Sequence, residues 1–149
     1  MPDWLTHVVI GLLLTELFSV KKKSVVLLGA ILPDILPKII LLQLLVPLPI
    51  FNNKVLEAAH VPFIFFLGSM IAATLFRYRY WKIVWWLNLG ALSHFLSDAL
   101  LRHFGEGGVQ LLYPLTSQKY TLNLLWQDQT YLLLVPVLLL YLLIRKYKK

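Results

Sequence analysis

Long apolar runs alternate with short polar turns along this chain. A helix of about 20 apolar residues is long enough to cross the hydrocarbon core of a bilayer. The pattern predicts five such segments, at residues 4–20, 24–46, 56–76, 82–104 and 130–144. It therefore predicts an all-α integral membrane bundle, with residues 1–149 forming a single domain.

Two prolines interrupt the second apolar segment. Pro33 and Pro37 each lack the backbone N–H that a helix interior requires, so we expect the helix to break between them. At membrane depth, such a break is tolerated where the backbone packs within protein or lines a wet cavity. Asp34 lies inside this predicted break.

Basic residues gather in alternate turns between the apolar segments. Ten of the fourteen lysines and arginines lie in the ranges 21–23, 77–82 and 145–149. Because cytoplasmic loops are enriched in these residues, the N-terminus is predicted outside and the C-terminus in the cytoplasm of the cell (inner) membrane. The net charge of +7 is spread over separate turns, a placement that does not indicate nucleic-acid binding.

Composition narrows the chemistry that is available. Hydrophobic residues make up 59% of the chain and charged residues 14%, which is too apolar for an ordinary soluble domain. The absence of cysteine excludes disulfides and thiolate ligands. A metal would have to be held by imidazole and carboxylate groups, which suit zinc best, with manganese or iron as alternatives.

Polar residues that a bilayer should reject recur within the apolar segments. A charged side chain at the centre of a membrane helix costs about 2.5–3.5 kcal/mol, and coordination to a buried cation compensates for that cost. On the predicted topology, these residues lie in the outer half of the bilayer or at its middle. They predict a divalent metal site that opens to the outer face, with five candidate ligands: His7, Asp34, His60, His94 and Asp98.

His94 and Asp98 are four residues apart, so they lie on one face of a helix. They can bind one cation together, or Asp98 can bridge two. Blander interpretations remain open for the other candidates: His7 as an interfacial histidine beside Trp4, and Asp34 as a helix N-cap. His60 follows Glu57 by three residues, a ligand spacing that di-iron bundles use in two copies, and only one copy is present here.

Further polar residues surround the predicted site. Arg102 is placed to pair with Asp98 or to offer a fork of donors to a phosphate. His103 is either an interfacial residue or a second-site ligand with Glu106. The segment 105–129 is either a lid over the site or a loop on the membrane interface.

Several motifs occur in an order that belongs to a known family. They are Asp3-Trp-Leu-Thr-His7, Leu28-Gly-Ala-Ile-Leu-Pro-Asp34, His60, Gly90-Ala-Leu-Ser-His-Phe-Leu-Ser-Asp98 and Leu111-Leu-Tyr-Pro-Leu115. On these motifs the chain resembles the YdjM-like family of membrane-bound metal-dependent hydrolases, which is distantly similar to the zinc-dependent phospholipase C group. The resemblance covers residues 1–117, and the final apolar segment carries no signature.

The resemblance implies one metal held by Asp34, His60, His94 and Asp98, with Asp98 bridging toward a second cation near His7. The chain departs from the family around His60, where the sequence reads Glu57-Ala-Ala-His60. That departure makes Glu57 a candidate substitute ligand or general base.

These observations predict a phospholipase- or phosphatase-like hydrolase that cleaves an ester or phosphoester bond of a lipid or lipid-linked substrate. Glu57 or Asp34 would accept a proton, and Arg102 would stabilise developing negative charge. A structural metal site in a membrane interaction protein is the alternative, and a small transporter is less favoured because the chain has one broken segment and no internal repeat. Homo-oligomerisation stays open.

Overall fold

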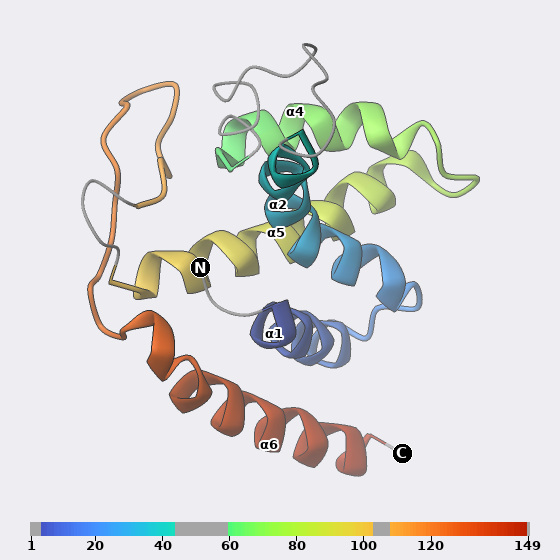
Figure 1. Ribbon diagram of the computed structural model, residues 1–149. Helices are drawn as coiled ribbons and strands as arrows, with labels where there is room; N and C mark the ends of the chain where they lie inside the picture. Colours follow the sequence, from blue (N-terminus) through green and yellow to red (C-terminus); the bar gives the residue numbers. More distant parts are fainter. Residues whose placement is uncertain (1–3, 44–59, 103–107, 149) are drawn as a thin grey trace.

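The computed structural model describes residues 4–43, 60–102 and 108–148. Within these ranges the chain is all-α, as predicted. The described residues form two isolated β-bridges and no β-strand. Figure 1 shows the helices, which are α1 (Trp4–Leu17), α2 (Lys23–Gln43), α4 (Pro62–Ala73), α5 (Tyr80–Leu100) and α6 (Tyr131–Tyr147), with a short 3₁₀ turn η1 (Gln127–Gln129) before α6.

Each of these helices coincides with one of the predicted apolar segments. Their ends differ by up to six residues, and the predicted stretches 44–46, 56–59 and 103–104 lie outside the described residues. Within the described parts of the chain, no helix combines the length and the apolar character that crossing a membrane requires. The membrane-spanning arrangement therefore stays a prediction.

The predicted break in the second segment is wrong, because α2 runs without interruption through Pro33 and Pro37. Each proline removes one N–H from the helical ladder and leaves a carbonyl oxygen four residues earlier without its usual partner. For Pro37 that oxygen is the one of Pro33, and the ring of His60 lies 3.2 Å from it. A side chain from outside the helix thus takes the place of the missing backbone donor.

α2 and α5 cross at unusually short range because glycine lies on both helices at the crossing point. A Cβ atom on Gly29 would lie 2.1 Å from the Leu87 carbonyl oxygen. A Cβ atom on Gly90 would lie 2.0 Å from the Val26 carbonyl oxygen. Since real Cβ atoms do not approach backbone oxygens so closely, only glycine permits this crossing.

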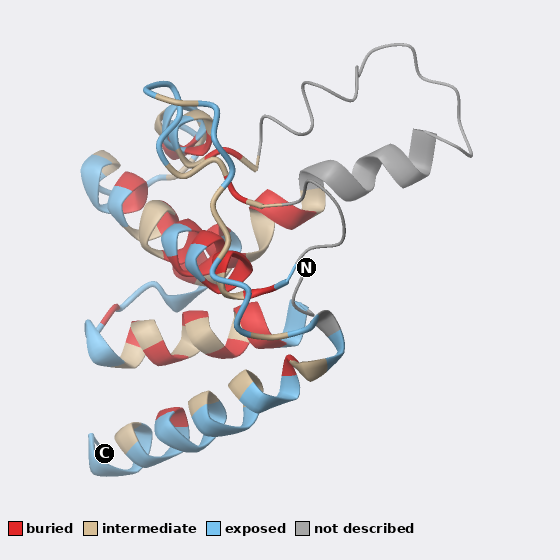
Figure 2. Ribbon diagram, turned by 90° about the vertical axis from the view of Figure 1, so that its left-hand side faces the viewer, coloured by how far each residue is buried: buried red, intermediate tan, exposed pale blue. Residues whose placement is uncertain are grey.

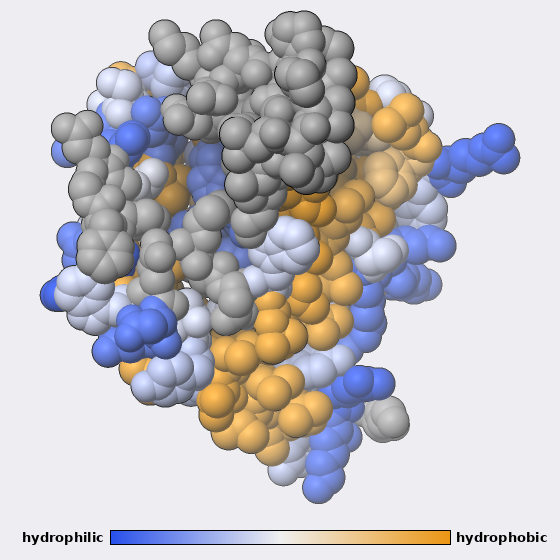
Figure 3. Space-filling view, in the orientation of Figure 1, coloured by the Kyte–Doolittle hydropathy of each residue, from blue (hydrophilic) through white to orange (hydrophobic). Residues whose placement is uncertain are grey.

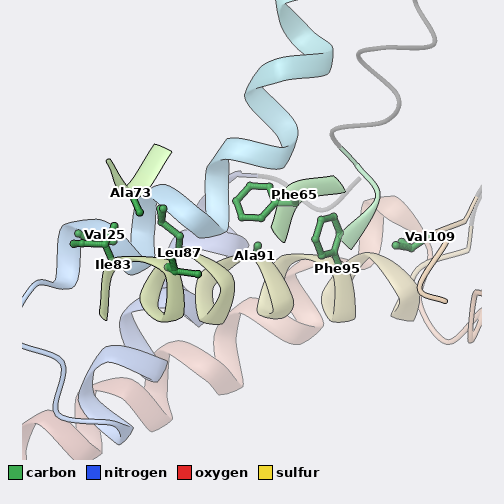
Figure 4. Packing of buried hydrophobic residues seen from close by; sticks show 9 residues of the cluster. Val25, Phe65, Ala73, Ile83, Leu87, Ala91, Phe95 and Val109 are labelled. Carbon is green, nitrogen blue, oxygen red and sulfur yellow. The ribbon is translucent and has the colours of Figure 1, made fainter. Parts of the chain in front are cut away.

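The other helices pack around this crossing. α4 lies along α5, and α6 packs on α1 (Figure 1). A hydrophobic cluster fills the space between α2, α4 and α5, with Phe65, Leu87 and Phe95 among its largest members (Figure 4). Figure 2 shows that buried positions concentrate on α5 and the helix faces that turn toward it, while α6 is mostly exposed.

Three basic turns meet on one side of the molecule. The Lys148 ammonium donates to the Glu16 carbonyl, which joins the end of α6 to the end of α1. The Lys22 ammonium lies 5.9 Å from the centre of the Tyr78 ring, which joins the α1–α2 turn to the α4–α5 turn. Figure 3 shows hydrophilic side chains along the right-hand edge of a broad apolar surface.

The chain returns to the end of α5 after the turn that follows it. The Leu122 N–H donates to the Ala99 carbonyl at 2.6 Å, and the Leu124 N–H donates to the Leu100 carbonyl at 2.9 Å. These bonds satisfy carbonyls that a helix end leaves without partners. The described part of the predicted 105–129 connection thus packs on the end of α5, while 105–107 lie outside the described residues.

Candidate metal centre

The fold brings the five candidate ligands to one place. His7 comes from α1, Asp34 from α2, and His94 and Asp98 from α5, while His60 lies just before α4. The two aspartates, His7 and His94 are at most 1% exposed, whereas the His60 side chain is 20% exposed. His60 is therefore the one member of this group that opens to the surface.

Asp98 lies at the centre of the group. Its Oδ2 atom is 2.7 Å from His60 Nε2 and 3.4 Å from His94 Nε2. Its Oδ1 atom faces the other way and is 3.6 Å from His7 Nε2. On the opposite side of His94, Asp34 Oδ1 lies 3.7 Å from the same Nε2 atom. All three imidazoles therefore present Nε2 to a carboxylate.

The other ring nitrogen of each histidine faces an acceptor outside the group. His94 Nδ1 lies 2.8 Å from the Ala30 carbonyl oxygen, and His60 Nδ1 lies 3.2 Å from the Pro33 carbonyl oxygen. A carbonyl oxygen only accepts hydrogen bonds, so the two Nδ1 atoms must carry the protons. In a neutral imidazole, the proton on Nδ1 leaves a lone pair on Nε2.

His7 is fixed in the same way through a hydroxyl group. Ser97 Oγ donates to the His94 carbonyl at 2.8 Å, which uses its only hydrogen. Its distance of 3.1 Å from His7 Nδ1 is then a bond that the imidazole donates. His7 also stacks on His94, with ring centres 4.0 Å apart. Three rings are thus oriented by outward N–H donation.

Neutral rings in these orientations aim lone pairs at carboxylate oxygens, an arrangement that requires a cation or protons between them. Within the described residues, His94 Nε2 and Asp98 Oδ1 are buried without a hydrogen-bond partner. Metal-bound histidines commonly donate their second N–H to a carbonyl or similar acceptor, as these three do. The arrangement fits a buried divalent cation.

The spacing of the donor atoms around His94 is close to that of a tetrahedral site, whereas His60 Nε2 and Asp98 Oδ2 are at hydrogen-bond distance, 2.7 Å. Ligand atoms 2.0–2.1 Å from a tetrahedral zinc ion lie about 3.3–3.4 Å apart. The distance from His94 Nε2 to Asp98 Oδ2 is 3.4 Å, and the distance to Asp34 Oδ1 is 3.7 Å. One donor atom from each of Asp34, His60, His94 and Asp98 lies within 4.8 Å of the others, so this cluster could hold a metal ion.

The four-residue spacing predicted that Arg102 lies on the same helix face as Asp98, and the structure does not place it there. α5 ends at Leu100, and Leu101 is extended, so Arg102 does not continue the face that carries Asp98. Its Nε atom donates to the Asn123 carbonyl at 2.9 Å, and its guanidinium lies 4.9 Å from the centre of the Trp126 ring. Its predicted catalytic role stays a prediction.

Three other candidates lie outside the described residues. They are Glu57, His103 and Glu106.

Sequence reasoning missed the groups that orient the rings. Ser97 lies three residues after His94, a spacing at which a hydroxyl bonds back to its own helix. Pro37 lies four residues after Pro33, a spacing that frees one carbonyl and could have indicated an acceptor. Nothing in the sequence identified Ala30 as the carbonyl that holds His94.

Comparison with known proteins gives a match to a family model. The family model described as YdjM inner membrane protein matches residues 1–149. No curated protein and no solved structure matches the chain.

Proposed function

The chain belongs to the YdjM inner membrane protein family, and we propose that it is a membrane-embedded, metal-dependent hydrolase. The proposed substrate is a lipid or lipid-linked molecule, cleaved at an ester or phosphoester bond. The observation that carries the proposal is the convergence of His7, His60 and His94, each with Nε2 toward Asp98 and Nδ1 toward an outer acceptor.

A divalent cation held by this cluster would polarise a carbonyl or phosphoryl oxygen and make water a stronger nucleophile at neutral pH. Zinc suits the imidazole and carboxylate donors best, with manganese or iron as alternatives. Asp34 and Asp98 would balance the cation's charge. Asp34 or Glu57 would accept the proton that water loses on attack, and Arg102 would stabilise the negative charge that develops.

The exposed side of His60 sets where a substrate would reach the cluster. The other ligands of the group are buried, so the reacting bond would approach past the His60 ring. Large apolar side chains are exposed on α4 nearby, including Phe63, Phe66 and Leu67. Exposed apolar surface of this kind marks a membrane or partner contact, and it favours a substrate delivered from the lipid phase.

The positions of the basic turns support a definite orientation. His7 lies ten residues before the end of α1 and Asp98 eighteen residues after the start of α5. At 1.5 Å per residue, these positions are about 15 and 27 Å along their helices from the basic side. With that side toward the cytoplasm, the cluster would lie toward the outer face and the N-terminus outside.

A structural metal site is the second candidate, and one observation favours it. His7, Asp34, His94 and Asp98 are almost fully buried and come from three helices that the cation would tie together. Structural sites are closed by four protein ligands, whereas catalytic sites keep a position for water. The two candidates therefore differ in whether the exposed side of His60 admits a substrate.

The test begins with elemental mass spectrometry of the full chain purified in detergent, with His94→Ala and Asp98→Ala as variants. We expect about one or two equivalents of zinc, manganese or iron, and the loss of most of that metal in both variants. Trp85→Ala is the matched control, because Trp85 lies on α5 and is 65% exposed. It should retain the metal.

The metal-loaded protein is then assayed on phospholipids, lipid phosphates and acyl esters. Hydrolysis by the wild type and by Trp85→Ala, but not by Asp98→Ala, is the expected result. Bound metal without turnover on any of these substrates would favour the structural site. Absence of bound metal after exposure to zinc, manganese and iron would overturn both interpretations.

A further inference from the structure

An apolar groove runs along the side of α5 that carries leucines rather than metal-ligand candidates. Its volume is about 700 Å³. Ile10 and Leu13 line it from α1, Phe18 lines it from the turn that follows α1, and Val137 lines it from α6. On α5 the lining extends from Leu89 to Leu100. Eleven helical steps of 1.5 Å make that wall about 16 Å long.

Hydroxyl groups in the groove offer little to a polar occupant. Ser93 Oγ donates to the Gly90 carbonyl at 2.7 Å, and Ser97 Oγ donates to the His94 carbonyl at 2.8 Å. Thr121 Oγ1 donates to the Leu101 carbonyl at 2.6 Å. Their hydrogens are used within the protein, so the groove favours hydrocarbon over groups that need a hydrogen-bond donor.

The groove and the metal centre share one wall residue. Ser97 lines the groove and also accepts the hydrogen bond from His7 Nδ1. At the same end of α5, the lining includes Thr121 and Leu122, which precede the Asn123 carbonyl that holds Arg102. A hydrocarbon chain whose polar end lies at this end of the groove would therefore place that end near the Arg102 guanidinium.

From these contacts we propose that the groove binds one acyl chain of a lipid whose polar end carries a phosphate. The inference rests on the proposed function for the identity of that lipid as a substrate. The occupant is a lipid because the lining is apolar, the chain belongs to a membrane protein family, and the cation of Arg102 lies at the end where an anionic headgroup would emerge. An acyl-bearing phospholipid or lipid phosphate meets all three conditions.

The test measures binding rather than turnover. The full chain in detergent is titrated with phosphatidic acids of increasing acyl length, and the bound lipid is counted by native mass spectrometry. We expect one lipid per chain, with affinity rising about tenfold for every two methylenes until the groove is filled. Asp98→Ala should bind the same lipid, because the groove does not require the metal.

Leu96→Trp narrows the groove and should weaken binding about tenfold for each pair of methylenes that the indole displaces. Leu139→Trp is the matched control, because Leu139 is 56% exposed against 52% for Leu96 and lies on α6 outside the lining. It should bind lipid as the wild type does. Arg102→Gln should weaken phosphatidic acid but not the uncharged diacylglycerol.

Equal binding by Leu96→Trp and Leu139→Trp, or affinity independent of acyl length, would overturn the proposal. So would a homodimer that Leu96→Trp dissociates, because a second copy would then occupy the groove. A different outcome would separate the two proposals. If lipid binds with the expected length dependence but metal-loaded protein does not hydrolyse it, the proposed function is contradicted and the groove is still a lipid-binding site.

Discussion

Two faces of α5 reverse the usual distribution of polar and apolar residues. On the face toward α2, His94 and Asp98 are at most 1% exposed. On the face toward the groove, Leu92 and Leu96 are each 52% exposed. In water, burying the first pair and exposing the second would both be unfavourable.

The reversal is understandable if each face meets the surroundings that suit it. Buried imidazoles and carboxylates are stabilised when a cation lies between them and backbone carbonyls hold their outer N–H groups. Exposed leucines are favourable against hydrocarbon, whether from the bilayer or from a lipid chain in the groove. One helix thus separates a polar centre from an apolar surface, and Ser97 lies on the boundary between them.

The largest expected effect follows from removing the close helix crossing beneath the polar face. In Gly90→Ala the added Cβ would lie 2.0 Å from the Val26 carbonyl, so α2 and α5 must separate. We expect the free energy of unfolding to fall by about 3 kcal/mol, the upper part of the range for overpacking, because backbone cannot move aside as a side chain can. Thermal unfolding in detergent, followed by tryptophan fluorescence, measures the change.

Gly68→Ala is the control for this substitution. Gly68 lies on α4, and no atom outside its own helix lies within 4 Å of the Cβ that would be added. Alanine should raise the free energy of unfolding by about 0.5–1 kcal/mol, because it restricts the unfolded chain more than glycine does. If both variants changed stability equally, the crossing would not be what holds the polar face together.

The sequence was sufficient to identify the polar residues of the cluster, but it did not show which contacts allow them to be buried. The four-residue spacing predicted His94 and Asp98 on one helix face, and His94 Nε2 indeed lies 3.4 Å from Asp98 Oδ2. The apolar segments also located every described α-helix. These features depend on local periodicity, which a single sequence carries.

Features that depend on pairs of helices could not be predicted in the same way. Pro33 and Pro37 predicted a broken helix, yet α2 continues through both. His60 supplies a donor for the Pro33 carbonyl, and the sequence does not reveal that contact. Arg102 followed Asp98 by four residues, but α5 ends between them and the helical spacing no longer applies. In both places tertiary contacts override local rules.

A smaller effect is expected where the two faces of α5 meet. Ser97→Ala removes the acceptor of the His7 Nδ1 bond, so the His7 ring loses one constraint on its orientation. Loss of an outer partner typically costs about 10–100-fold in metal affinity, and the lower end applies here because stacking on His94 still holds the ring. Competition with a metal-sensitive dye measures that affinity.

Ser93→Ala provides the matched comparison, one helical turn away. Like Ser97, Ser93 lines the groove and donates its hydroxyl hydrogen to a backbone carbonyl, that of Gly90. Unlike Ser97, it is not the acceptor of the His7 Nδ1 hydrogen bond. Metal affinity should stay at the wild-type value. An equal loss in both variants would mean that the groove wall, rather than the His7 hydrogen bond, controls the metal centre.

The smallest change in metal affinity is expected from Pro37→Ala, which tests how α2 supports the polar face. Alanine restores an N–H at position 37, and this N–H competes with His60 Nδ1 for the Pro33 carbonyl. A net hydrogen bond is worth about 1 kcal/mol, so metal affinity should fall about fivefold. The metal-free protein should become more stable, because proline in a helix interior costs about 3 kcal/mol.

Pro136→Ala separates these two consequences. Pro136 also lies inside a helix, but that helix is α6, which packs on α1 and contributes none of the cluster residues. Its replacement should stabilise the metal-free protein in the same way and leave metal affinity unchanged. Opposite signs for stability and metal affinity in Pro37→Ala alone would show that the proline maintains the orientation of His60 at the expense of helix stability. Unchanged metal affinity in both variants would mean that the bond to Pro33 does not constrain the ring.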